Sequence, residues 1–178
     1  MEVGLLAVLN RVRAVLFNGR LSQELPDWLK LQTITEAQYV FWPPWGEYGQ
    51  PDVVIILMSG TIPFGRLVIE VKLDANKSGS AEDEEATEAP DPDQLRRYWQ
   101  GLKKKQEEDG IKPLGVIYLT SHAIPPSDEL KKSLDREQGN WMGWLSWRDV
   151  WAAMRTASEL LPSGAALPAF DLAEILAS

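Results

Sequence analysis

The chain has 178 residues, of which 44% are hydrophobic and 25% charged, a composition typical of one soluble globular domain. It has no cysteine, which excludes disulfides, cysteine zinc sites and a cysteine nucleophile and fits a cytoplasmic location, and it has no apolar run that could span a membrane. The net charge of −8 weighs against a nucleic-acid partner, but without seven acids clustered between residues 82 and 93 it rises to −1, so the body of the protein can still present a basic face.

Apolar residues near the N-terminus recur at helical spacing and predict an amphipathic helix over residues 3–17, ended by Asn18 and Gly19. Residues 21–31, which include Pro26, are expected to form a short helical or irregular stretch. Residues 33–42 are a candidate first strand, ended by Pro43 and Pro44.

Two apolar, β-branched runs follow, over residues 51–57 and 66–73, with glycine and proline between them. They predict a β-hairpin with a longer loop. A hairpin centred near residues 61 and 62 would pair Val53 with Glu70, which places Asp52 within one register step of Glu70.

The second half of the chain alternates polar and apolar segments. Residues 74–93 are acidic and predict a mobile, solvated insertion, and an amphipathic helix capped by Asp91 or Asp93 is expected from residue 93 to 105. A strand over residues 114–119 and a helix over 147–161, begun by a capping box of Ser146 and Asp149, complete the pattern. We therefore expect an α/β domain over residues 1–161, with a small mixed central sheet flanked by helices, and a tail over 162–178 that begins a further segment.

Charged residues within the predicted hairpin indicate a metal site. Because strand side chains alternate between faces, Glu70 and Lys72 share one face and Asp52 lies nearby. Charges inside apolar strands are costly unless they are paired or bind a metal. Mg²⁺ prefers carboxylate oxygens, so Asp52, Glu70 and the carbonyl of Val71 are candidate ligands, and Lys72 is expected to act electrostatically on a reacting group bound to the metal.

Pro51-Asp52, followed eighteen residues later by Glu70-Val71-Lys72, resembles the motif of the PD-(D/E)XK nuclease superfamily, also called restriction-endonuclease-like. The segment from Asp93 to Tyr98 resembles the glutamine-containing helix of its RecB-like exonuclease branch, in which Gln94 would be the matching residue. The resemblance spans about residues 2–154.

The resemblance implies a restriction-endonuclease-like core and a nuclease that uses Mg²⁺ or Mn²⁺ to hydrolyse phosphodiester bonds in nucleic acid, with DNA as the first candidate. It implies catalytic roles for Asp52, Glu70, Lys72 and Gln94, a part in restriction, phage defence or repair, and a homodimer or larger protein assembly. An acid on the first helix completes the metal site in many members. Glu2 is the candidate here, and Glu36 is the second.

Two other classes of function stay open from the sequence. One is a catalytically inactive nuclease fold that binds nucleic acid or protein, against which the intact motif argues. The other is an interaction module that uses the acidic segment and a cluster of tryptophans, for which core packing is the simpler explanation (Trp141, Trp144, Trp147 and Trp151).

Several other residues carry weaker hypotheses. Trp42 and Trp45 precede Asp52 and are better placed to touch a substrate than the C-terminal tryptophans. The single histidine, His122, would either act on a phosphate or, as the simpler explanation, be a loop residue without a catalytic role. A row of basic residues would either follow a phosphate backbone or form the polar face of a helix (Arg96, Arg97, Lys103, Lys104 and Lys105).

Overall fold

The structure is a computed structural model. It describes residues 3–16, 20–22, 34–72, 93–134, 139 and 141–160. In chain order the elements are α1 (Val3–Leu9), β1 (Arg13–Val15), β2 (Leu21–Ser22), β3 (Glu36–Phe41), the 3-10 helix η1 (Gly46–Tyr48), β4 (Val53–Ser59), β5 (Ile62–Lys72), α3 (Gln94–Asp109), β6 (Pro113–Thr120), α4 (Ser127–Ser133), β7 (Met142–Ser146) and α5 (Trp147–Leu160).

The strands of the described residues form one mixed seven-stranded sheet in the order β2-β1-β7-β6-β5-β4-β3. Strands β3, β4 and β5 are antiparallel neighbours, β5, β6 and β7 run parallel, and β1 pairs antiparallel with both β7 and β2. Helix α3 connects the parallel strands β5 and β6. The mixed α/β class predicted from the sequence is therefore confirmed.

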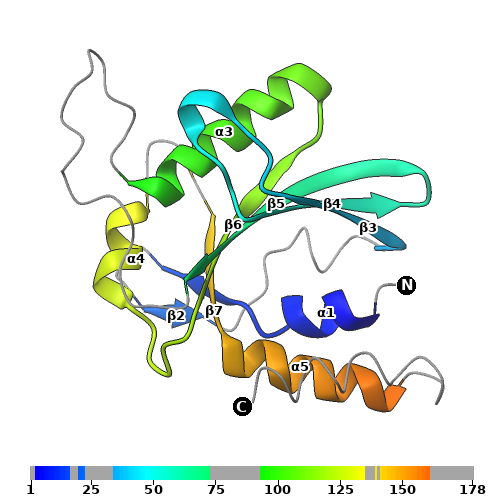
Figure 1. The fold of residues 1–178 in the computed structure, drawn as a ribbon, viewed down its shortest axis with the longest axis vertical. Helices are drawn as coiled ribbons and strands as arrows, with labels where there is room; N and C mark the ends of the chain where they lie inside the picture. The colour runs from blue at the N-terminus through cyan, green and yellow to red at the C-terminus, as the bar shows by residue number, and fades with distance from the viewer. Residues whose placement is uncertain are drawn as a thin grey trace.

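The sheet separates two layers of helices. Helix α3 covers one face, and α1 and α5 lie together on the other (Figure 1). Alternation along β5 explains this arrangement, because Val68 packs into the cluster beneath α3 while Leu67 packs into the cluster that includes Leu5 and Leu9 of α1. Each face of the central strands is buried, as expected for parallel strands covered on both sides.

The N-terminal helix is shorter than the pattern predicts. Helix α1 ends at Leu9, and Arg13–Val15 forms β1, so the prediction of a helix over residues 3–17 is wrong over residues 10–16; residue 17 lies outside the described residues. Pairing with β7, in which Arg13 lies opposite Trp144, takes the segment into the sheet. Val12, just before β1, and Val15 within it are buried, whereas Leu16, the last apolar position of the helical pattern, is exposed.

The predicted hairpin forms, but with a different register. Strands β4 and β5 pair with Val53 opposite Ile69, not opposite Glu70 as predicted. The turn consists of Gly60 and Thr61, and an irregularity after Leu57 inserts one extra residue into β5. Continuing this register places Asp52 opposite Glu70, so the predicted proximity holds although the pairing was off by one residue.

A glycine lets the loop before Asp52 approach α3 closely. A Cβ atom at Gly101 would lie 2.7 Å from Cε3 of Trp45 and 3.0 Å from Cβ of Tyr48. Trp45 is buried under α3, and η1 contacts the helix. The loop is thereby fastened to α3 on its way into β4.

The C-terminal helix begins with the predicted capping box. The amide of Asp149 donates to Oγ of Ser146 at 3.2 Å, and the amide of Ser146 donates to Oδ2 of Asp149 at 3.1 Å. Helix α5 ends at Leu160, within one residue of the prediction. In the described part of the chain, no helix is long and apolar enough to cross a membrane.

Some predictions lie outside the described residues. These concern Glu2, residues 23–31, the acidic segment up to residue 92, and the tail over 162–178.

Candidate metal-dependent active site

A buried ion pair lies near the end of β5. Glu70 is only 2% exposed, and its Oε1 lies 2.7 Å from Nζ of Lys72, which is 20% exposed. Both side chains project from the face of β5 that α3 covers, as the alternation predicted. The pair is therefore held at the border between the protein interior and water.

Asp52, which immediately precedes β4, lies beside this pair. Its Oδ2 accepts a hydrogen bond of 2.8 Å from the backbone amide of Val71, the residue between Glu70 and Lys72. The structure therefore brings together the two carboxylates and the lysine that the motif predicted. The carbonyl of Val71 stays a predicted ligand.

Gln94, the first residue of α3, reaches back to Glu70. Its Nε2 donates to Oε1 of Glu70 at 2.9 Å. The start of the helix is fixed by Asp93, whose Oδ1 accepts from the amides of Leu95 and Arg96, each at 3.1 Å. This N-cap, one of the two that the sequence offered, aims Gln94 at the carboxylate.

Tyr98 completes the cluster and was not predicted to belong to it. Its hydroxyl accepts from Nε2 of Gln94 at 2.7 Å and donates to the carbonyl of Gln50 at 3.1 Å. Burial and the nearby charge of Glu70 raise the pKa of Tyr98, so the hydroxyl stays neutral. The sequence could have indicated this contact, because Gln94 and Tyr98 are four residues apart on a helix and therefore share a face.

The second carboxylate oxygen of Glu70 has no hydrogen-bond partner, although it is buried. Burial, helped by the adjacent Asp52, raises the pKa of Glu70 against the opposing effect of Lys72. A buried carboxylate oxygen without a partner, next to a second carboxylate, is the arrangement in which a hard divalent cation would supply the missing interaction. The donor set therefore fits Mg²⁺ or Mn²⁺.

Among the described residues, the structure identifies no third acidic ligand. The described residues contain no group of three or more His, Cys, Asp or Glu side chains that could hold a metal. Glu36 is exposed on β3 opposite Met58, six residues along β4 from Asp52. At strand geometry this is about 20 Å, so Glu36 is excluded as a ligand.

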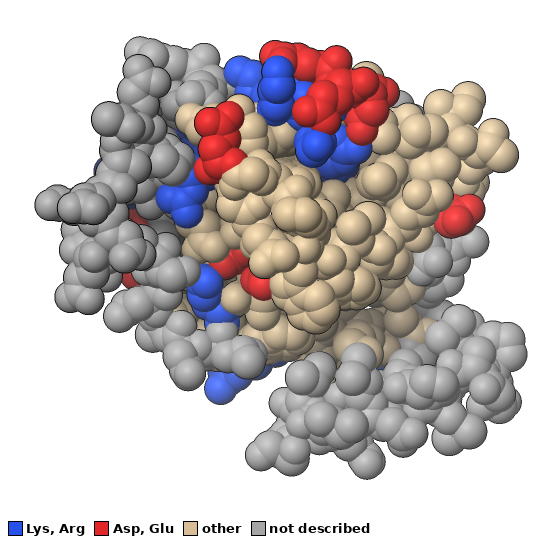
Figure 2. All heavy atoms as spheres, turned by 45° about the horizontal axis from the view of Figure 1, so that its top comes forward, with Lys and Arg blue, Asp and Glu red and all other residues tan. Residues whose placement is uncertain are grey.

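Two of the five basic residues on α3 form ion pairs with acids on the same helix. Lys104 and Lys105 form ion pairs with Glu107 and Glu108 at 3.0 and 2.7 Å. Figure 2 shows Lys and Arg side chains next to Asp and Glu side chains at the top of the molecule, over the C-terminal half of α3. This part of the helix is a mixed polar face and not a basic one, which weakens its predicted role in following a phosphate backbone.

His122 lies two residues beyond β6, whose end is paired with the end of β5. Its Nδ1 is buried and has no hydrogen-bond partner. Among the described residues, the hydrogen bonds and ion pairs of Asp52 and Glu70 are made with Val71, Gln94 and Lys72, and the role of His122 stays a prediction.

The tryptophans divide between core and surface. Trp144 is fully buried, and its Nε1 donates to Oγ1 of Thr120 at 3.1 Å, which agrees with core packing. Trp45, one of the two placed near a substrate, is also buried. Trp42 is exposed.

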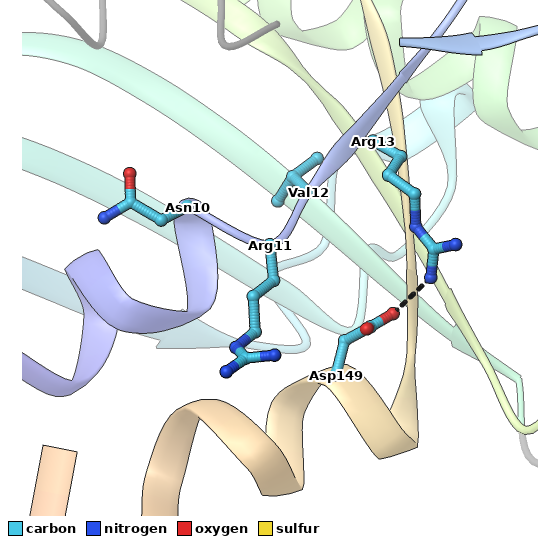
Figure 3. A pocket seen from close by; sticks show the side chains of 5 residues that line it. All are labelled: Asn10, Arg11, Val12, Arg13 and Asp149. Carbon is cyan, nitrogen blue, oxygen red and sulfur yellow. Dashed lines mark hydrogen bonds and ion pairs between the residues drawn. The ribbon is translucent and has the colours of Figure 1, made fainter. Parts of the chain in front are cut away.

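A hollow of about 360 Å³ lies elsewhere, between the end of α1 and the start of α5 (Figure 3). It is lined by Asn10, Arg11, Val12, Arg13 and Asp149. Arg13 pairs with Asp149 at 2.6 Å and lies over the ring of Trp144, 4.3 Å from its centroid. Two strands separate β1 from β5, and the hollow has a single acid, so it does not offer the donor set of a metal site.

Comparison of the chain with protein-family models, with curated proteins and with solved structures found no match.

Proposed function

We propose that this protein is a divalent-metal-dependent nuclease of the PD-(D/E)XK type, with a restriction-endonuclease-like core, that hydrolyses phosphodiester bonds in nucleic acid, DNA being the first candidate. The observation that carries the proposal is the buried carboxylate of Glu70. One oxygen is bound by Lys72 and Gln94, and the other, beside Asp52, has no partner. The order of elements around it, hairpin then helix then parallel strand, supports the same class.

Asp52 and Glu70 would hold the cation, with the carbonyl of Val71 as a further candidate ligand. A divalent cation bound there supplies a water of lowered pKa and stabilises negative charge on the phosphate. Asp52 is fixed in place by the amide of Val71, so this carboxylate needs little rearrangement to bind the metal.

Lys72 supplies positive charge to the reacting phosphate. Its ammonium lies beside Glu70 and is partly exposed, so it can contact a phosphate oxygen while it stays paired. Gln94 and Tyr98 orient Glu70, because together they link its carboxylate to the backbone at Gln50. They are positioning residues in this scheme.

The test is cleavage of plasmid and of single-stranded DNA with Mg²⁺ or Mn²⁺. Lys72→Ala should lower the rate by roughly a hundred- to a thousandfold, as expected when one electrostatic group at the transition state is lost. Lys104→Ala, which removes the same charge from an exposed ion pair on α3, should leave cleavage unchanged. Cleavage by Lys72→Ala at the wild-type rate would show that the activity does not come from this site.

Calorimetric titration with Mn²⁺ separates a nuclease from an inactive relative of one. Wild type and Lys72→Ala should both bind the ion, whereas a double Asp52→Asn and Glu70→Gln variant should not. If wild type neither binds Mn²⁺ nor cuts either substrate, the protein is better described as a binding module.

A further inference from the structure

An exposed aromatic pair stands at the end of β3, next to the candidate active site. Phe41 and Trp42 are 57% and 62% exposed, and their ring centroids lie 5.8 Å apart at an angle of 45°. By contrast, Trp45, Trp99 and Trp144 are all buried. An exposed tryptophan beside a second exposed ring is a large apolar surface that packing within the described residues does not explain.

Trp42 is also held in an unfavourable backbone conformation. Its φ angle is +49°, and it is the only residue other than glycine with a positive φ in the described part of the chain. A bulky residue in the left-handed region is strained, and such strain persists only where the surroundings fix it. Strain at an exposed aromatic residue suggests that the position of the ring serves a function.

Hydrogen bonds connect this residue to the metal-binding carboxylates. The amide of Trp42 donates to the carbonyl of Asp52 at 3.1 Å, and Nε2 of Gln50 donates to the carbonyl of Trp42 at 2.7 Å. The carbonyl of Gln50 accepts from Tyr98, whose hydroxyl accepts from the Gln94 amide bound to Glu70. One continuous network therefore fixes both the aromatic residue and the carboxylate.

The distance suits a neighbouring nucleotide. Trp42 and Asp52 lie on paired strand ends, which places their backbones about 5 Å apart. Bases in a stacked strand are separated by about 3.4 Å. A phosphodiester at Asp52 and Glu70 would therefore bring a base one or two nucleotides away within reach of the indole ring.

We propose that Trp42 stacks on an unpaired base next to the scissile bond, so that the substrate is nucleic acid with unpaired bases there, such as a single strand or a frayed end. This inference rests on the proposed nuclease function. Aromatic side chains stack on the face of any base, whereas in an intact duplex those faces are covered by neighbouring base pairs. A second copy of the chain pairing with β3, the edge strand of the sheet, is the competing occupant.

The experiment measures binding of a short fluorescent single-stranded DNA by anisotropy in the Lys72→Ala background with Mn²⁺. Trp42→Ala should weaken binding roughly 5- to 150-fold, the range expected for loss of one stacked base, and Trp42→Phe should retain most of the affinity. Trp42→Gly also removes the ring, and glycine adopts the observed backbone angle without strain. It should therefore show the loss of affinity expected for Trp42→Ala, and it replaces that variant in the test if the alanine variant folds poorly. Ile62→Ala is the control, because Ile62 is 68% exposed at the turn of the β4–β5 hairpin, the end away from Asp52 and Glu70.

Abasic substrates locate the contact. In protein that retains Trp42, removing the base at one position of the DNA should weaken binding. In Trp42→Ala the same abasic position should have no further effect, because the stacking contact is already lost with the indole ring. Blunt duplex DNA should bind equally well to both proteins. Equal losses for Trp42→Ala and Ile62→Ala, or a loss confined to duplex, would refute the stacking contact.

Two further outcomes separate the possible failures. If Trp42→Ala converts a dimer to a monomer in light scattering and leaves DNA affinity unchanged, the aromatic pair is a protein interface and the inference is wrong. If Lys72-dependent cleavage is present but insensitive to Trp42, only this inference fails. If there is neither cleavage nor DNA binding, the proposed function fails as well.

Discussion

Replacing Glu70 by Gln should stabilise the metal-free protein while abolishing cleavage. The carboxylate is almost fully buried beside Asp52, and one of its oxygens has no partner. Gln has the same shape, and its amide oxygen can still accept from Lys72 and Gln94. The substitution therefore removes a buried charge and its repulsion from Asp52 but keeps the hydrogen bonds.

The raised pKa of Glu70, caused first by burial, determines the sign of the effect. The folded state binds a proton at Glu70 more tightly than the unfolded chain does, so the free energy of unfolding falls as pH rises from the unfolded value of about 4.3 through the raised folded pKa. Gln has no such dependence. Above that range we expect Glu70→Gln to raise the free energy of unfolding by roughly 0.5–2 kcal/mol relative to wild type. Each kcal/mol corresponds to about 2–4 °C in Tm for a domain of this size.

The assay is urea and thermal unfolding at pH 8, with and without Mg²⁺. Saturation at a hundred times Kd should stabilise wild type by about 2.7 kcal/mol and Glu70→Gln much less. Glu107→Gln, which removes an exposed charge on α3, should change stability by less than about 0.5 kcal/mol. A large destabilisation by Glu70→Gln without metal would refute the reasoning, because it would mean that the ion pair with Lys72 outweighs the desolvation of Glu70.

Three further outcomes are expected. Tyr98→Phe should lower single-turnover cleavage roughly 10- to 100-fold, because Gln94 loses the hydroxyl that orients it; unchanged cleavage would remove Tyr98 from the site. Gly101→Ala should destabilise the protein by about 1–3 kcal/mol in urea unfolding, because its Cβ would overlap the ring of Trp45; a more stable variant would show that the contact is loose. Asp149→Asn should cost about 1–2 kcal/mol at neutral pH. Although burial opposes ionisation, hydrogen bonds and an ion pair lower the pKa of Asp149, so the difference from wild type should vanish as pH falls below about 3.9 through the lowered folded value; a difference independent of pH would contradict this account.

The central part of the fold could be predicted from local patterns. The strands of the hairpin are apolar and β-branched, and glycine and proline mark the turn, so β4 and β5 were recognisable. Alternation along β5 then predicted the shared face of Glu70 and Lys72. The register was predicted one residue off, because the turn lies at Gly60 and Thr61 and not at residues 61 and 62. The extra residue in β5 reduces the resulting error from two residues to one.

The elements that were missed depend on distant partners. Strand β1 has three residues and β2 has two, and each exists through pairing that the local sequence does not encode. Helix α4 and strand β7 were also not predicted. Tyr98 was not predicted to belong to the site, because its hydrogen bond to Gln50 joins residues 48 positions apart.

The pairing of β1 with β7 also has a consequence for the order in which the protein can assemble. Arg13 and Asp149 are 136 positions apart, and α1 packs on α5. During synthesis, β1 and α1 therefore emerge long before β7 and α5, the elements with which they pack. A nascent chain that has already emerged past α3 contains Asp52, Glu70, Lys72 and Gln94, yet lacks the strand and helix that close the opposite side of the sheet. Long-range contacts of this kind slow folding. The proposed catalytic residues would thus gain a rigid support only after β7 and α5 have been synthesised.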